Sequence, residues 1–228
     1  MIDIKLPWTE GAPSLDVMDG SIALVKDEFR DSAYGWTREL LARASQDMDL
    51  NKAREFWGSV KAREASYALF LLARYYWKDD ISEITQLAFC RQEHETEVDD
   101  LSWDEFEIME DPESMGDCSW NLDLTEPIEG LSQIRGDLPS LDDLQSIEDK
   151  HGAITEGALN DLIRMICRDG SGKHLSLIQI QRIGLKDRKR IRKLLNGEEH
   201  ALIDLKFIRK CDQCPRKAYG ILNLRSFF

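Results

Sequence analysis

The chain has 228 residues, 42% hydrophobic and 32% charged, which is long enough to bury one large core or two smaller ones. Its formal net charge of −13 argues against duplex nucleic acid as the main partner, because surfaces that bind phosphates are basic. The start of the chain lacks the features of a secretory signal, and the longest apolar run, residues 67–73, is too short to span a membrane. We therefore expect a globular protein with no membrane segment and with its five cysteines reduced.

Helical periodicity predicts two helices in the first part of the chain. Apolar residues recur at helical spacing over residues 21–44 and over residues 50–77, where we expect a bend at Gly58. The aromatic stripe of the second helix fits a surface that faces the core, and also a groove for a partner. A charged break then precedes residues 81–90, whose alternation and β-branched content predict a strand.

Acidic residues dominate the middle of the chain, with eleven of them between residues 93 and 113. Prolines and glycines are spread through residues 94–129. This composition predicts a solvated, weakly structured insertion in which Trp103, Phe106 and Trp120 pack locally.

The last third of the chain contains short predicted helices and then two predicted strands. One helix begins after Ser140, a second spans residues 155–170, and a basic third spans residues 186–197. Residues 201–210 and 217–228 have the pattern of strands, and a cysteine-containing turn joins them. We therefore predict a mostly helical α+β protein with two small, zinc-ribbon-like β-hairpins.

Three segments are expected along the chain. The first is an N-terminal helical unit, residues 1–92, that ends in the first hairpin. The second is the acidic insertion or linker, residues 93–130, and the third is a C-terminal helical unit, residues 131–228, that ends in the second hairpin.

The two predicted hairpins resemble each other. In both, an amphipathic helix and a charged break lead into a strand that ends in a cysteine, Cys90 in the first and Cys211 in the second. Each cysteine is followed two residues later by a glutamine, Gln92 or Gln213. This similarity suggests an internal duplication.

The C-terminal part resembles a known family. The run IGLKDRKRIRKLL, the run ALIDLKFIRKCDQC and the final LNLRSFF resemble the baseplate-hub assembly proteins of contractile-tailed bacteriophages. In that family a helix containing Asp-Arg, a strand ending in C-x-x-C and a terminal Phe-Phe recur. The resemblance covers about half of the chain, residues 63–101 and 155–228.

The resemblance implies a non-enzymatic protein of tail morphogenesis. Such a protein would contact other tail and baseplate proteins in the host cytoplasm during assembly, or within the virion baseplate. We expect the docking surfaces to be an exposed Phe227-Phe228 end and the acidic residues 93–113, although the protein's own core could also bury the two phenylalanines.

The C-x-x-C at Cys211 and Cys214 predicts half of a zinc site, because a turn between two strands can aim both sulfurs at one metal ion. Cys90 and, four residues later, His94 supply two further candidate ligands in the first hairpin. A Cys3His site made from these four residues would clamp the two hairpins together around Zn²⁺.

A second interpretation, two reduced cysteines on an ordinary hairpin, stays open. Glu93 occupies the position where a second knuckle cysteine is expected, and Pro215 occupies one where glycine is favoured. Cys118 and Cys167 each lie alone in the sequence, and a redox use of the C-x-x-C is less well supported because no helix follows it.

Weaker sequence patterns point to other functions. Residues 182–217 contain twelve bases and five acids, which allows a zinc-stabilised adaptor for nucleic acid, although no aromatic residues interleave the bases. Apparent phosphate and calcium loops lack their essential glycines, and the four histidines lie far apart. We therefore predict no active site.

Overall fold

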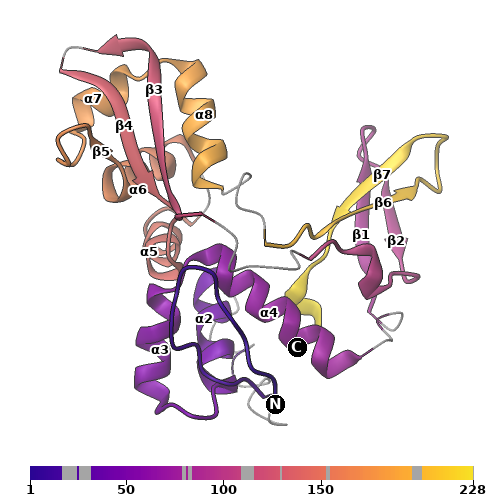
Figure 1. Cartoon of the computed structure of the whole chain (residues 1–228). Coiled ribbons are helices and arrows are strands. Elements are labelled where there is room, and N and C mark those ends of the chain that lie inside the picture. Colours follow the sequence, from indigo (N-terminus) through magenta and orange to yellow (C-terminus); the bar gives the residue numbers. More distant parts are fainter. Residues whose placement is uncertain are drawn as a thin grey trace.

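The computed structural model describes residues 1–16, 25, 32–78, 81, 84–108, 116–128, 130–152, 155–196 and 202–227. Within these residues the chain forms helices and two antiparallel sheets, one of four strands and one of three. Figure 1 shows the four-stranded sheet on the right, the three-stranded sheet with its helices at the upper left, and α2 and α3 below. The predicted α+β class is confirmed.

The N-terminal part contains helices α2 (Ala33–Ala44), α3 (Leu50–Ser59) and α4 (Ala62–Trp77). Ser32 caps α2, and residues 21–24 and 26–31 of the predicted first helix lie outside the described residues. The predicted continuous helix over residues 50–77 is two helices rather than one bent helix. The chain breaks where the carbonyl of Val60 accepts a hydrogen bond from the N–H of Leu141 at 3.0 Å, because that contact replaces a helical one.

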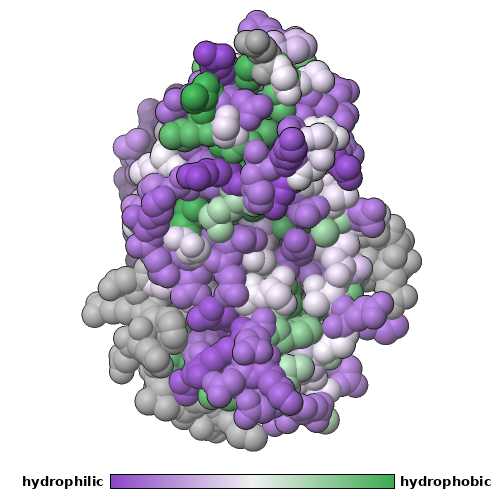
Figure 2. Space-filling model, turned by 90° about the vertical axis from the view of Figure 1, so that its left-hand side faces the viewer, coloured by the Kyte–Doolittle hydropathy of each residue, from purple (hydrophilic) through white to green (hydrophobic). Residues whose placement is uncertain are grey.

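Strands β3 (Ser119–Ile128), β4 (Leu131–Asp137) and β5 (Arg168–Asp169) form the three-stranded sheet in the order β3-β4-β5. Helices α6 (Glu156–Ile166), α7 (Leu177–Arg182) and α8 (Leu185–Leu195) share a hydrophobic core with it. The three-stranded sheet and these helices are called the three-stranded lobe below. Helix α5 (Leu141–His151) lies between this lobe and the N-terminal helices, where it contacts both α2 and α6. Figure 2 shows this side of the molecule as mostly hydrophilic, with hydrophobic residues gathered at the top.

The prediction of a weakly structured insertion is wrong for much of residues 93–130. This segment contains β2 (Glu95–Val98), the 3-10 helix η1 (Trp103–Glu105) and β3. Strands also occur in more places than the two that the sequence pattern indicates. The predicted segment boundaries, after residues 92 and 130, fall within the turns of two hairpins, β1–β2 and β3–β4.

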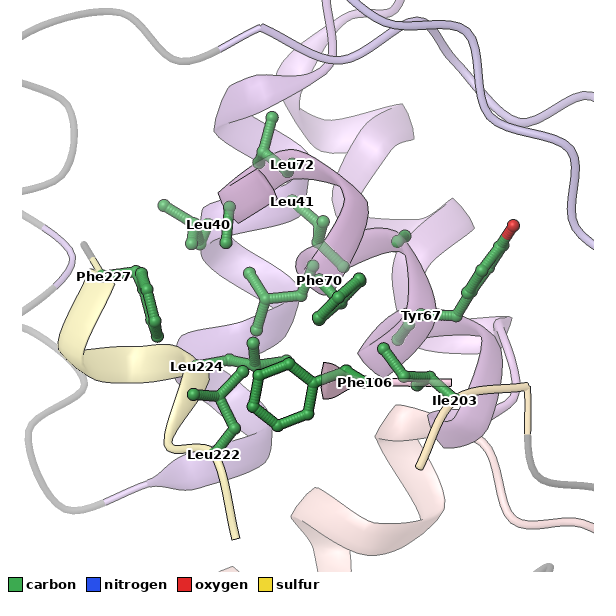
Figure 3. Close-up of a cluster of buried hydrophobic side chains, with 14 of the residues drawn as sticks. Leu40, Leu41, Tyr67, Phe70, Leu72, Phe106, Ile203, Leu222, Leu224 and Phe227 are labelled. Atoms are coloured by element: carbon green, nitrogen blue, oxygen red, sulfur yellow. The ribbon is translucent and has the colours of Figure 1, made fainter. Parts of the chain in front are cut away.

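The larger hydrophobic core forms around α4. Figure 3 shows Phe70 and Leu72 from this helix beside residues from α2 and from the C-terminal end of the chain. The aromatic stripe of residues 50–77 is therefore mainly a core surface, as one of the two interpretations predicts. Its most deeply buried members include Trp57 and Phe70, both with no exposed area.

The C-terminal end forms the 3-10 helix η4 (Leu224–Phe227), which packs into this core. Phe227 is only 2% exposed, and its ring centroid lies 5.1 Å from that of Trp103. The indole N–H of Trp77 donates to the carbonyl of Phe227 at 2.7 Å. The prediction of an exposed docking end is therefore wrong for Phe227, because distant aromatic residues cover it, and Phe228 lies outside the described residues.

Strands β1 (Gln86–Cys90), β2, β7 (Lys217–Ile221) and β6 (Lys206–Lys210) form the four-stranded sheet in the order β2-β1-β7-β6. Two hairpins, β1–β2 and β6–β7, meet along β1 and β7, which pair antiparallel with Cys90 opposite Ala218. Strand β1 ends at the edge where β7 begins, so both hairpin turns lie at the same end of the sheet, at the upper right of Figure 1. The two turns can therefore contact each other although they are far apart in the sequence.

Candidate metal centre

The structure brings together the four residues that the sequence indicates as metal ligands. The ligand atoms of Cys90, His94, Cys211 and Cys214 all lie within 4.8 Å of one another, and this cluster could hold a metal ion. Cys90 and Cys211 are buried, and the other two are half-buried. The residues come from two turns that are more than 100 positions apart in the chain, so only the pairing of β1 with β7 places them together.

The turn of the first hairpin explains why the histidine can replace a cysteine one position later than expected. Glu93 has a φ of 61°, a left-handed conformation that non-glycine residues rarely adopt. Its N–H donates to the carbonyl of Cys90 at 2.9 Å, and the N–H of Cys90 donates to the carbonyl of His94 at 3.2 Å. This arrangement adds one bulged residue to the turn, which returns His94 to the position opposite Cys90.

The turn of the second hairpin presents both of its sulfurs without a glycine. Strand β6 ends at Lys210, and the N–H of Cys211 donates to the carbonyl of Arg216 at 2.9 Å, which closes the loop. Pro215 has no N–H, but Cys214 accepts a hydrogen bond from the backbone N–H of Arg216 instead. The proline is therefore compatible with a knuckle at this position.

All three sulfurs accept the backbone N–H of the residue two positions later. The N–H of Gln92 lies 3.3 Å from Cys90 Sγ, and the N–H groups of Gln213 and Arg216 serve Cys211 and Cys214 in the same way. Hydrogen bonds of this kind stabilise a thiolate, the form of cysteine that binds metals. The repeated pattern shows that both turns present sulfur with the same local geometry.

The pKa values of the two C-x-x-C thiols are displaced in opposite directions. Desolvation acts to raise the pKa of Cys211, but the N–H of Gln213, His94 and the neighbouring thiols outweigh it and lower the pKa to about 6. For Cys214, the N–H of Arg216 acts to lower the pKa, but desolvation and the adjacent Cys211 and Cys90 raise it above its usual value. A first thiolate at Cys211 thus opposes a second one at Cys214, because two negative charges this close repel each other.

Two distances within the cluster can be compared with those of a tetrahedral zinc site. Cys214 Sγ lies 3.8 Å from Cys90 Sγ, and Cys211 Sγ lies 3.9 Å from His94 Nδ1. Zinc–sulfur bonds of about 2.3 Å in a tetrahedron place two sulfurs about 3.8 Å apart, and replacing one sulfur by nitrogen shortens the edge slightly. The Cys90–Cys214 distance therefore has the length of a tetrahedral zinc site, whereas the Cys211–His94 distance is longer and would have to shorten around the ion.

Polar contacts between the hairpins lie close to the ligands. The N–H of Asp212 lies 3.5 Å from Thr96 Oγ1, and the side-chain amide of Gln213 donates to the carbonyl of Glu95 at 3.4 Å. Both are long, and therefore weak, hydrogen bonds. The turn of the second hairpin consequently lies against β2, where these weak hydrogen bonds add to the packing of Cys211 and Cys214 on the core.

Cys118 and Cys167 lie outside the cluster. Burial raises the pKa of the Cys167 thiol to about 12, so this residue is a protonated core side chain at neutral pH. Burial also raises the pKa of Cys118. Neither residue belongs to the metal cluster found among the described residues.

The basic segment, residues 182–217, is divided between the three-stranded lobe and the four-stranded sheet. Its first part forms α8, which packs on β3, and its second part forms β6 and the start of β7. Within the second part, Arg209 forms ion pairs with Asp100 at 2.8 Å and with Glu105 at 2.7 Å. Part of the basic segment thus faces the chain's own acidic segment, and residues 109–113 of that acidic segment lie outside the described residues.

No family model, curated protein or solved structure matches this chain. Among the residues that the structure describes, no helix has both the length and the apolar composition that crossing a membrane requires.

The sequence interpretation missed the features of the backbone that make the cluster possible. The left-handed Glu93 has no signature in the sequence, because glutamate adopts this conformation only when its surroundings impose it. The N–H groups that donate to the sulfurs do have a weak signature in the sequence. Any residue except proline, placed two positions after a cysteine, can supply such an N–H.

Proposed function

We propose that this chain is a zinc-stabilised structural protein that acts by binding other proteins and not by catalysis. Cys90, His94, Cys211 and Cys214 would bind one Zn²⁺ and so join the two hairpins into a single sheet. Its proposed setting is the baseplate hub of a contractile-tailed bacteriophage, where it would help to assemble the tail or form part of it.

The convergence of four ligand atoms within 4.8 Å is the observation that supports this proposal most strongly. Three sulfurs and one imidazole are the donors of closed structural zinc sites, and such a site keeps no position open for a substrate. The softness of thiolates favours zinc over magnesium or calcium, which bind oxygen. The donor set therefore supports a role in holding the fold together.

The strand order supports a duplication of the hairpin. Reading across the sheet as β2-β1-β7-β6, each hairpin contributes its second strand and then its first, so the two follow the same order. Both first strands lead to a cysteine whose sulfur accepts the N–H of a glutamine, Gln92 or Gln213. Two copies of one unit, side by side, would bring their ligands to a common end of the sheet.

Cobalt substitution tests the proposed site. The purified protein, stripped of metal by a chelator and then titrated with Co²⁺, should show the absorption bands of tetrahedral cobalt and a thiolate-to-cobalt charge-transfer band, both saturating at one equivalent. The variant C211S should lose the charge-transfer intensity of one thiolate, whereas C118S should behave as the wild type. Octahedral cobalt spectra without charge transfer would contradict the site.

The phage setting rests on the resemblance alone, and the residues that carry the resemblance can be located in the fold. The Asp-Arg pair of the family motif, Asp187 and Arg188, lies in α8, and β6 leads directly into the C-x-x-C. Phe227, the described half of the Phe-Phe ending, is part of the core and so has a structural role. The motif residues that the resemblance uses thus have positions in which they stabilise the fold.

Affinity purification from phage-infected cells tests this setting. A tagged copy of the chain should co-purify with tail or baseplate proteins identified by mass spectrometry, and its deletion should leave particles without complete baseplates. A phage whose tails assemble normally without the chain would contradict the proposed role, while leaving the zinc site unaffected.

A nucleic-acid adaptor is the second candidate, and the surface of α8 favours it. Lys186 and Lys189 are exposed on this helix, next to the exposed Arg190. The division of the basic segment between the three-stranded lobe and the four-stranded sheet argues against one continuous basic track. A shift with single-stranded DNA or RNA that weakens steeply with added salt would support this candidate, and no shift at low salt would remove it.

A further inference from the structure

The outward face of the four-stranded sheet carries a cluster of large apolar side chains. Five of them are between 43% and 66% exposed, although their strands alternate with residues buried in the core. They are Leu87, Phe89, Ile208, Tyr219 and Ile221. Single exposed apolar residues are common on soluble proteins, but a contiguous set on one sheet face marks an interaction surface.

The strand register places these residues side by side. Phe89 lies opposite Tyr219, and Tyr219 lies opposite Ile208, so one row of the face crosses three strands with apolar side chains. In the next row, continuing the β1–β7 register by one step sets Leu87 beside Ile221. The five side chains therefore form one patch.

Opposite charges border this patch on its two sides. On the β2 side, Glu95 pairs with Phe89 and Glu97 pairs with Leu87, and both glutamates are exposed. On the β6 side, the exposed Lys206 pairs with Ile221, and Lys210 follows at the same edge. The row through Leu87 and Ile221 thus runs from Glu97 to Lys206, whereas the row through Phe89 and Tyr219 runs from Glu95 to Ile208.

We propose that this face binds the same face of a second copy of the chain. A twofold axis between the two sheets, running parallel to the strands, would superpose the β2 edge of one copy on the β6 edge of the other. Leu87 would then face Ile221 of the second copy, and Glu97 would face its Lys206. The apolar patch would be covered while Glu97 of each copy meets Lys206 of the other.

The charge pattern distinguishes this axis from the other simple choice. A twofold axis perpendicular to the strands would place β2 on β2 and β6 on β6, so that acid would face acid and lysine would face lysine. Like charges in contact destabilise an interface. The pattern therefore selects the parallel axis, which is also compatible with the aligned packing of two sheets at about 30°.

The size of the face sets the expected strength of the dimer. Four strands about 4.8 Å apart, each contributing about five residues, make a face of roughly 15–20 Å on each side. This area is below the range of stable specific interfaces, so we expect a weak, reversible dimer that forms in the micromolar range. Along β1 the exposed Leu87 and Phe89 alternate with the buried Cys90, so the patch and this sulfur lie on opposite faces of the strand, and this inference does not depend on the proposed function.

Sedimentation equilibrium over about 5 to 500 µM tests the proposal, because it covers the micromolar range in which such a small interface should associate. The wild type should change from monomer to dimer across this range. The variants E97K and K206E should each raise the dissociation constant about tenfold or more, because each one makes two like-charge contacts in the dimer. A wild type that stays monomeric throughout would overturn the proposal.

The double variant E97K/K206E provides the decisive comparison. Within one chain these residues lie on the two outer strands, about 14 Å apart by strand spacing. They are therefore too far apart to form an ion pair with each other in the same chain. Recovery of the dimer to within about threefold of the wild type must then come from contacts between copies. A double variant that remains monomeric would overturn the proposed arrangement, and binding to a different protein through this face would then be the remaining explanation.

Two further variants distinguish specific association through this face from non-specific association. L87S/I221S should abolish the dimer, whereas I178S, on the exposed surface of α7, should leave it intact. Circular dichroism and bound-metal content should match the wild type in every variant, which shows that the sheet is preserved. An equal loss of association in I178S would overturn the assignment to the sheet.

Discussion

The four-stranded sheet and the three-stranded sheet are built from strands at very different separations along the chain. Strands β3 and β4 are joined by a short turn, and α6 to α8 follow soon after to cover them. In the four-stranded sheet, β1 and β7 are far apart in the chain, and Cys90 and Cys214 are 124 residues apart. Pairing strands that are far apart in the chain costs more loop-closure entropy. A cross-link between the two turns can offset this cost.

The two sheets also differ in what anchors them. The three-stranded lobe is anchored by the buried Asp187 of α8, which accepts hydrogen bonds from the N–H of Thr125 at 2.9 Å and from its hydroxyl at 2.8 Å. In the four-stranded sheet, the proposed zinc ion would have the equivalent role. Both sheets place a glycine opposite an aromatic ring, Gly136 against Trp120 and Gly220 against Phe207, because a Cβ there would overlap the ring. Local packing is thus similar in the two sheets, and the long-range connection differs.

Metal removal should give the largest difference between the two sheets. We expect a chelator, or the variant C90S, to destabilise the four-stranded sheet by on the order of 5 kcal/mol or more, because structural zinc contributes directly to folding. Hydrogen exchange followed by mass spectrometry should show faster exchange in β1, β2, β6 and β7 and unchanged exchange in β3 and β4.

The matched control for this prediction is C118S, which removes a thiol that lies outside the cluster. This variant should exchange like the wild type in all strands of both sheets. Equal acceleration in the two sheets after chelation would contradict the account, since it would mean that the metal supports the whole molecule.

The substitution F227A should have the next largest effect. Phe227 is buried between Trp77 and Trp103, so its truncation should lower the free energy of unfolding by about 3–5 kcal/mol. Denaturant unfolding monitored by tryptophan fluorescence would measure this loss. L185A, at a side chain that is 71% exposed, is the control and should change stability by less than about 0.5 kcal/mol.

The substitution D187N tests the anchor of the three-stranded lobe. Desolvation acts to raise the pKa of Asp187, but hydrogen bonds from Thr125 and the nearby Arg190 outweigh it, and the pKa is lowered in the folded state. At neutral pH the variant should lose roughly 1–3 kcal/mol, because the amide of asparagine replaces an acceptor of charged hydrogen bonds.

The pH dependence of this loss gives a second measurement. A carboxylate whose pKa is lowered by folding stabilises the protein above its unfolded pKa of about 3.9, and this stability disappears as the pH falls through the folded value. The difference between wild type and D187N should therefore be constant from about pH 5 to 8 and narrow below about pH 4. A difference that persists unchanged in acid would show that the charge of Asp187 contributes nothing.

The substitution R209M should have the smallest effect. Arg209 pairs with Asp100 and Glu105, and its guanidinium keeps the pKa of both carboxyl groups below their usual values. The pairs lie at the surface, where solvent screens them, so we expect a loss below about 1 kcal/mol that shrinks further in high salt. Thermal unfolding at low and high ionic strength would measure it, and a large loss that is independent of salt would contradict this expectation.

The sequence alone predicts the larger helices and the identity of the candidate ligands. Helix α4 has an apolar stripe at helical spacing, and the alternation before Cys90 and Cys211 indicates strands that end at these residues. Such patterns are local, so they can be read without knowing which segments meet. The α+β class follows from them.

The features that the sequence does not predict depend on long-range contacts or on conflicting local signals. Strand β3 alternates Trp120, Leu122 and Leu124 with outward polar residues, but its acidic surroundings and Pro127 obscure that pattern. Phe227 is covered by Trp77 and Trp103, which nothing in its own neighbourhood reveals. Burial of a chain end is thus decided by distant residues.

Measurement of bound zinc tests the central claim most directly. Protein purified without added chelator, analysed by inductively coupled plasma mass spectrometry, should contain one zinc per chain. C211S and H94A should each lose most of this zinc, whereas C118S should retain it. A wild-type protein that contains no zinc after expression in zinc-supplemented medium, and in which Cys90, Cys211 and Cys214 all react with a thiol reagent, would contradict the claim that these residues form a metal centre.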